Sequence, residues 1–334
     1  IRMTHFEIDS EVQQFIDTMT EVSSNLSTDS SIEQQRISSN AACRHFFSPY
    51  PVGIESSDNV VTGRHGLIPI RRYRNTLATI EADAQIIFLH GGGFILGDLD
   101  SHDDICAELC FKTGLDAISI DYRLAPEYKH PVHLDDVADA FELCWKPKSI
   151  VVGISAGAAL AAALSHRLKN TSRKPFGQVL VYPGLGGDLY DLDSYVANAA
   201  APLLTTTDIF YYRKIRCYDV EAAIHDPEFY PLVADDFNGL PPSIAFSADI
   251  DPLRDDARLY IEKLSAVGIY AECYNEPGLT HDYLRARHIS YKAGNSFQQI
   301  CLSVTLLSSA NGLSELMVDS GQLAGINDVL KSGN

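Results

Sequence analysis

The chain has 334 residues, with 26 basic against 44 acidic side chains and a formal net charge of −18 at pH 7. Nucleic acids need clustered Lys and Arg, and the densest basic stretch is Arg71-Arg72-Tyr73-Arg74, so the composition excludes a nucleic-acid partner and disfavours stable association with an anionic membrane. No segment reaches the roughly 18 apolar residues of a membrane span. The seven cysteines lack zinc-ligand spacing, so we expect a cytoplasmic protein with reduced thiols and no metal site.

The first 45 residues have the pattern of one or two polar helices, rich in Ser, Glu and Gln, with no place in a sheet. From about residue 66 onward, short apolar runs alternate with stretches of helical pattern, which is typical of a largely parallel sheet covered by helices on both faces. The expected strands are 85–89, 117–120, 149–153, 178–182 and 243–247, with a weaker candidate at 270–274.

A second region interrupts this alternation. Residues 186–232 are rich in Tyr, Asp and Pro and have helical patches but no strand pattern. Ligands of open α/β sheets bind at the carboxyl ends of the strands. We therefore expect residues 1–45 and 186–232 to form a helical cap over that end, with residues 46–185 and 233–334 as the two parts of the α/β core.

A serine follows the third expected strand, in the stretch Gly153-Ile154-Ser155-Ala156-Gly157, and an alanine-rich helical segment comes next. The pattern GxSxG alone is weak, but here it lies between a strand and a helix. Such a turn forces the serine into a strained conformation, and small flanking residues avoid clashes with the neighbouring strand and helix. The context predicts that Ser155 is a nucleophile.

A nucleophilic serine that transfers acyl groups also needs hydrogen-bond donors for the oxyanion that develops. The stretch His90-Gly91-Gly92-Gly93-Phe94 directly follows the first expected strand. Three glycines let backbone N–H groups approach a substrate oxygen without side-chain hindrance. A phosphate-binding loop is the alternative, but the GK[ST] of such a loop does not follow. The N–H of Ala156, next to the serine, is a further expected donor.

Five motifs occur together, in the order His90-Gly91-Gly92-Gly93, Tyr122-Arg123-Leu124-Ala125-Pro126-Glu127, Gly153 to Gly157, Asp251-Pro252-Leu253-Arg254-Asp255 and Gly278-Leu279-Thr280-His281. This combination resembles the hormone-sensitive-lipase-like family of α/β-hydrolases, specifically its bacterial esterases. The resemblance implies a mostly parallel eight-stranded sheet with a helical cap and a Ser/Asp/His carboxylesterase without a cofactor. It also implies that Gly92, Gly93 and Ala156 supply the oxyanion donors.

The order Ser155, Asp251, His281 is the one expected of this fold. His281 is expected to follow the last strand across a Pro277-Gly278 turn, at the ligand-binding end, and to act as general base. His90 is expected mainly to shape the glycine loop.

The acid has rivals along the chain. Asp249 ends a strand, and Asp255 and Asp256 lie in the first turn of the following helix, where carboxylates often only favour the helix dipole. The family pattern selects Asp251, which would hold the imidazole of His281 in one tautomer.

Apolar side chains of the expected cap, together with the residue after the glycine loop, are candidates for an apolar and confined substrate pocket. They are Phe94, Leu203, Leu204 and Tyr211. Aromatic residues at helical spacing also often serve only packing. We expect the substrate to be a small-molecule ester with a short to medium acyl chain. Homodimers are common in the family that the chain resembles.

Two positions depart from the family pattern. Ile154 stands where the family usually has Asp or Thr, which predicts the loss of a polar network beneath the serine turn, and Tyr283 stands where Phe is frequent. Two alternative functions stay open. A small-molecule receptor can share this fold, as the gibberellin receptor does with its histidine replaced, and an amidase uses the same triad.

Overall fold

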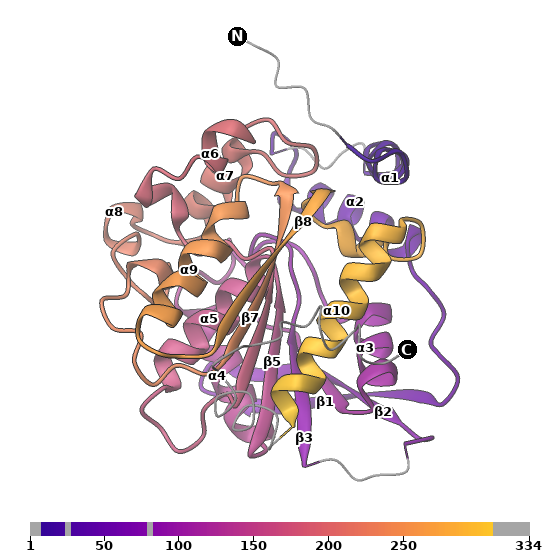
Figure 1. Ribbon diagram of the computed structural model, residues 1–334, viewed down its shortest axis with the longest axis vertical. Coiled ribbons are helices and arrows are strands. Elements are labelled where there is room, and N and C mark those ends of the chain that lie inside the picture. Colours follow the sequence, from indigo (N-terminus) through magenta and orange to yellow (C-terminus); the bar gives the residue numbers. More distant parts are fainter. Residues whose placement is uncertain (1–7, 24–27, 79–82, 310–334) are drawn as a thin grey trace, which may run out of the picture.

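An eight-stranded sheet crosses the protein, as Figure 1 shows, in a computed structural model that describes residues 8–23, 28–78 and 83–309. Its strands are β1 (Ile54–Gly63), β2 (Gly66–Asn75), β3 (Ala84–Leu89), β4 (Asp116–Ile120), β5 (Lys148–Ile154), β6 (Gly177–Val181), β7 (Ser243–Ile250) and β8 (Ala271–Thr280). They lie in the order β1-β2-β4-β3-β5-β6-β7-β8. Only β2 runs antiparallel to its neighbours, so the expected α/β-hydrolase sheet is confirmed.

The central strands are apolar because both of their faces are covered. Every residue of β3 and β6 is buried, as are all residues of β5 after its first. A strand in this position has no solvent face, so it shows a continuous apolar run rather than an alternation. The six strands expected from such runs are all present.

The hairpin of β1 and β2 was not among the expected strands. β1 is mostly exposed, and β2 contains Pro69 and buries only Ile68, Ile70 and Tyr73 among its ten residues. Among the strands of the described residues, β1 forms one edge of the sheet and pairs with β2 alone. A strand at an edge needs no apolar run, and this explains why the sequence pattern does not reveal it.

The expected turn at Pro277-Gly278 is wrong. Both residues belong to β8, which continues to Thr280 with a register shift against β7 between Ala248 and Ile250. A bulge of this kind bends a strand without ending it, and β8 is an edge strand, where the missing N–H of a proline is tolerated. His281 therefore follows the last strand directly rather than after a separate turn.

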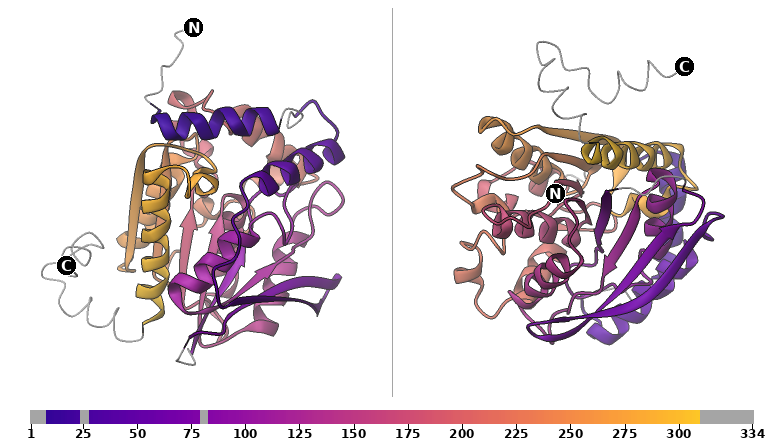
Figure 2. Two further views of the ribbon diagram at one scale, coloured as in Figure 1. Left: turned by 90° about the vertical axis from the view of Figure 1, so that its right-hand side faces the viewer. Right: turned by 90° about the horizontal axis from the view of Figure 1, so that it is seen from below.

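Helices cover both faces of the sheet, as Figures 1 and 2 show. The larger ones are α3 (Asp103–Thr113), α4 (Val132–Cys144), α5 (Ala156–Leu168), α9 (Arg254–Ala266) and α10 (Tyr291–Ser308). The apolar side chains of α3 and α10 join one core cluster, and those of α4, α5 and α9 join another on the opposite face. The sheet is therefore the middle layer of three.

Further helices lie beyond the carboxyl ends of the strands, at the top of Figure 1. They are α1 (Ser10–Val22), α2 (Ile32–His45), α6 (Ser194–Ala197) and α7 (Thr206–Arg216). The short helix α8 (Val220–Ala223) lies lower, at the left side of Figure 1. Asp9 caps α1, and Ser31 with Gln34 forms a capping box on α2, so local sequence sets where these helices begin. Among the described residues, no helix has the length and apolar character needed to cross a membrane.

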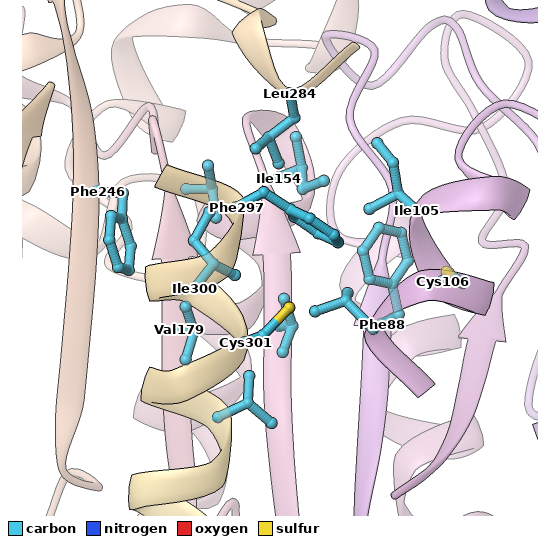
Figure 3. Close-up of a cluster of buried hydrophobic side chains, with 14 of the residues drawn as sticks. Phe88, Ile105, Cys106, Ile154, Val179, Phe246, Leu284, Phe297, Ile300 and Cys301 are labelled. Atoms are coloured by element: carbon cyan, nitrogen blue, oxygen red, sulfur yellow. The ribbon is translucent and has the colours of Figure 1, made fainter. Parts of the chain in front are cut away.

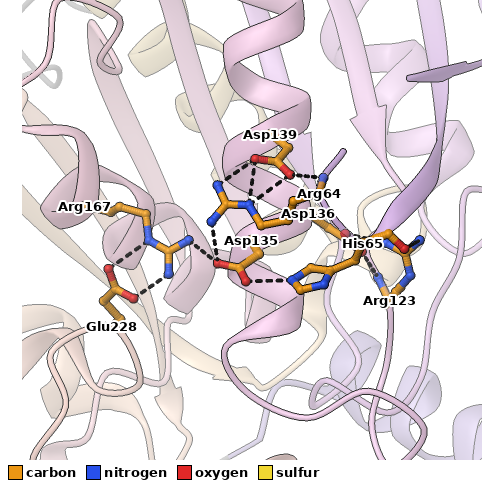
Figure 4. A network of polar contacts seen from close by, with 8 residues as sticks. All are labelled: Arg64, His65, Arg123, Asp135, Asp136, Asp139, Arg167 and Glu228. Carbon is orange, nitrogen blue, oxygen red and sulfur yellow. Dashed lines mark hydrogen bonds and ion pairs between the residues drawn. The ribbon is translucent and has the colours of Figure 1, made fainter. Parts of the chain in front are cut away.

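The acidic side chains of α4 connect several elements through ion pairs, which Figure 4 shows. Asp136 is fully buried and accepts a hydrogen bond from Arg123 at 2.5 Å. Asp139 pairs with Arg64 of the β1–β2 hairpin at 2.7 Å, and Asp135 pairs with Arg167 of α5 at 2.7 Å. The network joins the hairpin, the segment after β4 and α5 on one side of the sheet.

Candidate active site

Ser155 lies in a sharp turn between β5 and α5, with φ 53° and ψ −116°. A Cβ at Gly153 would lie 2.3 Å from the backbone oxygen of Gly157, and a Cβ at Gly157 would lie 2.1 Å from that of Leu89. No side chain fits at either position, so both glycines are required for the close approach of strand and helix. The sequence Gly-Ile-Ser-Ala-Gly thus produces the strained turn that raises the serine hydroxyl above the sheet.

Three side chains from different parts of the chain form a line of hydrogen bonds. The Oγ of Ser155 lies 2.9 Å from Nε2 of His281, and Nδ1 of His281 lies 2.6 Å from Oδ2 of Asp251. Asp251 is fully buried, and its Oδ1 accepts a hydrogen bond from the backbone N–H of Leu253 at 2.9 Å. Asn198 donates from Nδ2 to the backbone oxygen of Asp251 at 3.0 Å. The carboxylate is therefore fixed with one oxygen directed at the imidazole.

The surroundings of His281 decide its protonation. Burial by itself would lower the pKa of the imidazole, but the negative charge of Asp251 and the hydrogen bond to it outweigh burial, with help from Asp282. The pKa of His281 is raised above its ordinary value as a result. An imidazole in this position is a stronger base than a free histidine, which suits the removal of a proton from serine.

The three rival carboxylates have other partners. Asp249 accepts from Nδ2 of Asn275 at 3.2 Å, with its side chain 40% exposed. Asp255 pairs with Arg254 at 3.0 Å. Asp256 accepts backbone N–H groups of Leu185 and Gly187 and the hydroxyl of Tyr195, the contacts that hold the start of the 186–232 segment on α9. Of these carboxylates and Asp251, only Asp251 has a contact with His281.

The glycine loop follows β3 beside the serine. Gly92 has φ +123°, and a Cβ there would lie 2.2 Å from the backbone oxygen of Leu96. The backbone oxygen of Gly92 accepts the N–H groups of Ile95 and Leu96, which closes the loop. His90 is buried and stacks on Tyr122 with ring centroids 4.3 Å apart, and the Tyr122 hydroxyl donates to the His90 backbone oxygen at 2.8 Å.

Ala156 begins α5, where a backbone N–H has no acceptor inside the helix. Gly92, Gly93 and Ala156 all line one cavity with Ser155, so their backbones lie close to the serine. Backbone N–H groups that point into such a cavity can bind a negatively charged oxygen.

The cavity has a volume of about 420 Å³ and reaches from Ser155 and His281 to the helices above the sheet. Three of the four residues predicted for the substrate pocket, Phe94, Leu203 and Leu204, line this cavity. Side chains of α1, α2 and α7 complete the wall, among them Met19, Cys43, Ile209 and Tyr212. A cavity of this size matches the lower range of small-molecule sites.

Tyr211 does not line the cavity. Its hydroxyl accepts a hydrogen bond from Nε2 of Gln35 at 2.9 Å, and its ring packs on the cluster of Ile95, Leu96 and Ala125. The next residue, Tyr212, faces the cavity instead, close to Gly93. Adjacent residues on an α-helix point about 100° apart, so the choice depends on how α7 is rotated against the sheet.

The two positions that depart from the family pattern lie in the packed layer beneath the site. Ile154 is buried among apolar side chains, and Figure 3 shows it close to Leu284 and Phe297. Tyr283 is buried too, and its hydroxyl lies 2.7 Å from Oγ of Ser296. Its ring packs edge-on against Tyr182. The serine turn therefore rests on an apolar core at this point.

Several residues around the site carried no signal in the sequence. Tyr182 packs against His281 with ring centroids 4.7 Å apart, Asn198 holds the backbone of Asp251, and Arg216 lines the cavity. None of the three residues lies within a recognised sequence motif. Their positions depend on tertiary contacts, which the order of residues does not display.

The model of the alpha/beta hydrolase fold family matches residues 86–285. The carboxylic ester hydrolase LipN of Mycobacterium tuberculosis is 33% identical over 278 residues, which cover 78% of this chain and 72% of LipN. An ethyl acetate hydrolase of Pseudomonas putida is 31% identical over 250 residues, covering 71% of this chain and 78% of that relative. The solved structure of an ester hydrolase from the Lake Arreo metagenome superposes with a TM-score of 0.82 at 26% identity, covering 89% of this chain and 98% of that one. This chain therefore belongs to the alpha/beta hydrolase fold family, in its hormone-sensitive-lipase-like group of esterases.

Proposed function

We propose that this protein is a serine carboxylesterase that hydrolyses esters with short to medium acyl chains, with Ser155 as nucleophile, His281 as general base and Asp251 as the acid that orients it. The observation that carries the proposal is the unbroken line of hydrogen bonds from Ser155 through His281 to a buried Asp251, at the floor of a cavity. A receptor needs no such line, so the complete triad favours an enzyme.

The reaction proceeds in two acyl transfers. Ser155 Oγ attacks the ester carbonyl while His281 takes its proton, and the resulting oxyanion accepts hydrogen bonds from the N–H groups of Gly92, Gly93 and Ala156. His281 then gives that proton to the leaving alcohol, which breaks the ester bond and leaves an acyl-Ser155. Water repeats the sequence on the acyl-enzyme and releases the carboxylic acid.

We expect short acyl chains to be hydrolysed fastest, because the cavity is about 420 Å³ and apolar residues such as Phe94, Leu203 and Leu204 close it. Ethyl acetate hydrolase among the relatives supports this preference. The measurement is kcat/KM on p-nitrophenyl esters from acetate to palmitate at neutral pH, with matched p-nitroanilides to test for amidase activity. Activity that climbs steadily toward palmitate on emulsions would refute the chain-length part of the proposal.

The oxyanion role of the glycine loop predicts a defect for Gly92→Ala. The new Cβ would meet the backbone oxygen of Leu96 at 2.2 Å, so the loop must shift and its N–H groups leave their places. Loss of one such donor lowers kcat by about 10²- to 10³-fold. Gly268→Ala is the matched control: Gly268 also has positive φ, at +80°, but a Cβ there meets nothing within 4 Å. A control variant that loses as much kcat as Gly92→Ala would contradict the assignment.

The cellular location and the oligomeric state are also proposed. We propose a cytoplasmic protein that acts on a small-molecule ester and forms a homodimer, as is common in the family. Size-exclusion chromatography with light scattering on the purified protein tests the dimer, and a mass of one chain, 36.7 kDa, at micromolar concentration would exclude it.

A further inference from the structure

Arg216, the last residue of α7, is a buried cation in the wall of the active-site cavity. The residue is 2% exposed. Its Cζ lies 3.6 Å from the ring centroid of Phe94 and 4.1 Å from that of Phe229, and Nη1 donates to the backbone oxygen of Phe229 at 3.1 Å. Within the described residues, Nε and Nη2 have no hydrogen-bond partner.

The other two arginines of the cavity wall are neutralised by their own carboxylates, in the pairs Arg213–Asp188 at 2.6 Å and Arg285–Asp282 at 2.7 Å. No ion pair of Arg216 occurs within the described part of the chain. Asp226 acts on Arg216 through its charge, but its carboxylate bonds Nε2 of His130 at 2.9 Å and is 39% exposed. As far as the chain is described, the cavity wall therefore carries one positive charge that no contacting carboxylate balances.

A buried guanidinium without an anion is unfavourable, and the rings of Phe94 and Phe229 offset this only in part. Burial lowers the pKa of Arg216 to about 10, so the side chain is still charged at neutral pH. The two unpartnered nitrogens, Nε and Nη2, share one edge of the guanidinium. Two parallel N–H donors on one edge match the two oxygens of a carboxylate.

We propose that Arg216 determines substrate specificity by binding a carboxylate carried by the ester itself, so that the enzyme favours anionic monoesters over neutral esters of the same shape. This inference rests on the proposed function. The carboxylate belongs either to the acyl part, as in a monoester of a dicarboxylic acid, or to the alcohol part, as in an ester of a hydroxy acid. Nε and Nη2 are covered in the structure, so binding requires the guanidinium to move between the rings of Phe94 and Phe229 until this edge is exposed to the cavity.

Two pairs of substrates of equal shape separate these sources. In the first pair, anionic monoethyl succinate, with its charge in the acyl part, is compared with neutral ethyl 4-methylpentanoate. In the second pair, anionic O-acetylglycolate, with its charge in the alcohol part, is compared with neutral isobutyl acetate. The readout is the ratio of kcat/KM for the anionic ester to that for its neutral partner, from acid release in a pH-stat at constant ionic strength. Wild type, Arg216→Met and Arg216→Lys are compared, with thermal unfolding to establish that each is folded.

We expect one of the two ratios to fall about 10- to 100-fold in Arg216→Met, chiefly through a higher KM, because a hydrogen-bonded charge pair is lost. Arg216→Lys should show a smaller fall in the same ratio, since lysine retains the positive charge but lacks two parallel N–H donors. Lys214→Met is the matched control, because it removes the same charge from an exposed position of the same helix. It should leave both ratios unchanged.

Ratios in Arg216→Met that equal those of wild type would overturn the inference. If that variant does not fold, the wild-type ratios test the inference instead. An apolar cavity without a partner for the charge disfavours a carboxylate. A wild-type enzyme that prefers the neutral ester in both pairs would therefore also overturn the inference. Neutral-ester hydrolysis that disappears in Ser155→Ala tests the proposed function separately. Failure of the carboxylate specificity and failure of the esterase function can therefore be told apart.

Discussion

Replacement of Ser155 by alanine is expected to lower kcat on p-nitrophenyl acetate on the order of 10⁶-fold, the loss found when the nucleophile of a serine triad is removed. His281 then has no hydroxyl to deprotonate, although its 2.6 Å contact with Asp251 is independent of the serine. The donors of the glycine loop and the cavity stay in place. The small activity that remains should come only from binding and from the oxyanion donors.

The structure predicts that this variant folds normally. Alanine is smaller than serine, and the unusual backbone of position 155 is held by Gly153 and Gly157 rather than by the hydroxyl. Equal thermal unfolding midpoints and circular dichroism spectra for the two proteins are the control. A folded Ser155→Ala protein that keeps a few per cent of wild-type kcat would exclude Ser155 as the nucleophile.

Asp251→Asn is expected to lower kcat by about 10⁴-fold, because the amide favours the wrong tautomer of His281 and no longer stabilises the imidazolium. The pH profile should change too. The charge of Asp251 raises the pKa of His281 against the effect of burial, so its removal lowers that pKa. The histidine must be neutral to accept a proton, so the acid limb of kcat/KM should move to lower pH in the variant.

Asp249→Asn is the matched control for this experiment. It removes the same charge two residues away, from a carboxylate that contacts Asn275 and lies toward solvent. We expect it to keep most of the activity and an acid limb at the wild-type pH. If the two variants exchanged these behaviours, Asp249 rather than Asp251 would orient the histidine.

Much of the fold could be predicted because buried parallel strands have a distinctive composition. β3, β5 and β6 are apolar on both faces, and their runs are visible without any knowledge of their partners. The β1–β2 hairpin could not be predicted in this way. Its strands are at or near an edge and most of their side chains are not buried, so they lack the apolar runs of the central strands.

The candidate site divides along similar lines. The serine turn and the glycine loop could be predicted because each depends on local contacts. At their glycines, a side chain would clash with backbone atoms a few residues away or in the adjacent strand. From the sequence, Asp251 could be preferred to Asp249 as the acid of the triad only by comparison with the family pattern. In the structure it follows from which carboxylate faces His281.

What the sequence by itself determined is therefore the set of elements and motifs whose chemistry is local: the central strands, the strained serine and the glycine loop. Only the tertiary structure decided which side chains meet across the chain. It turned Tyr212 rather than Tyr211 toward the cavity, and it left Arg216 buried without a carboxylate partner among the described residues. The reason is physical: a helix such as α7 can present any of its faces to the sheet, and its rotation is set by packing against distant residues.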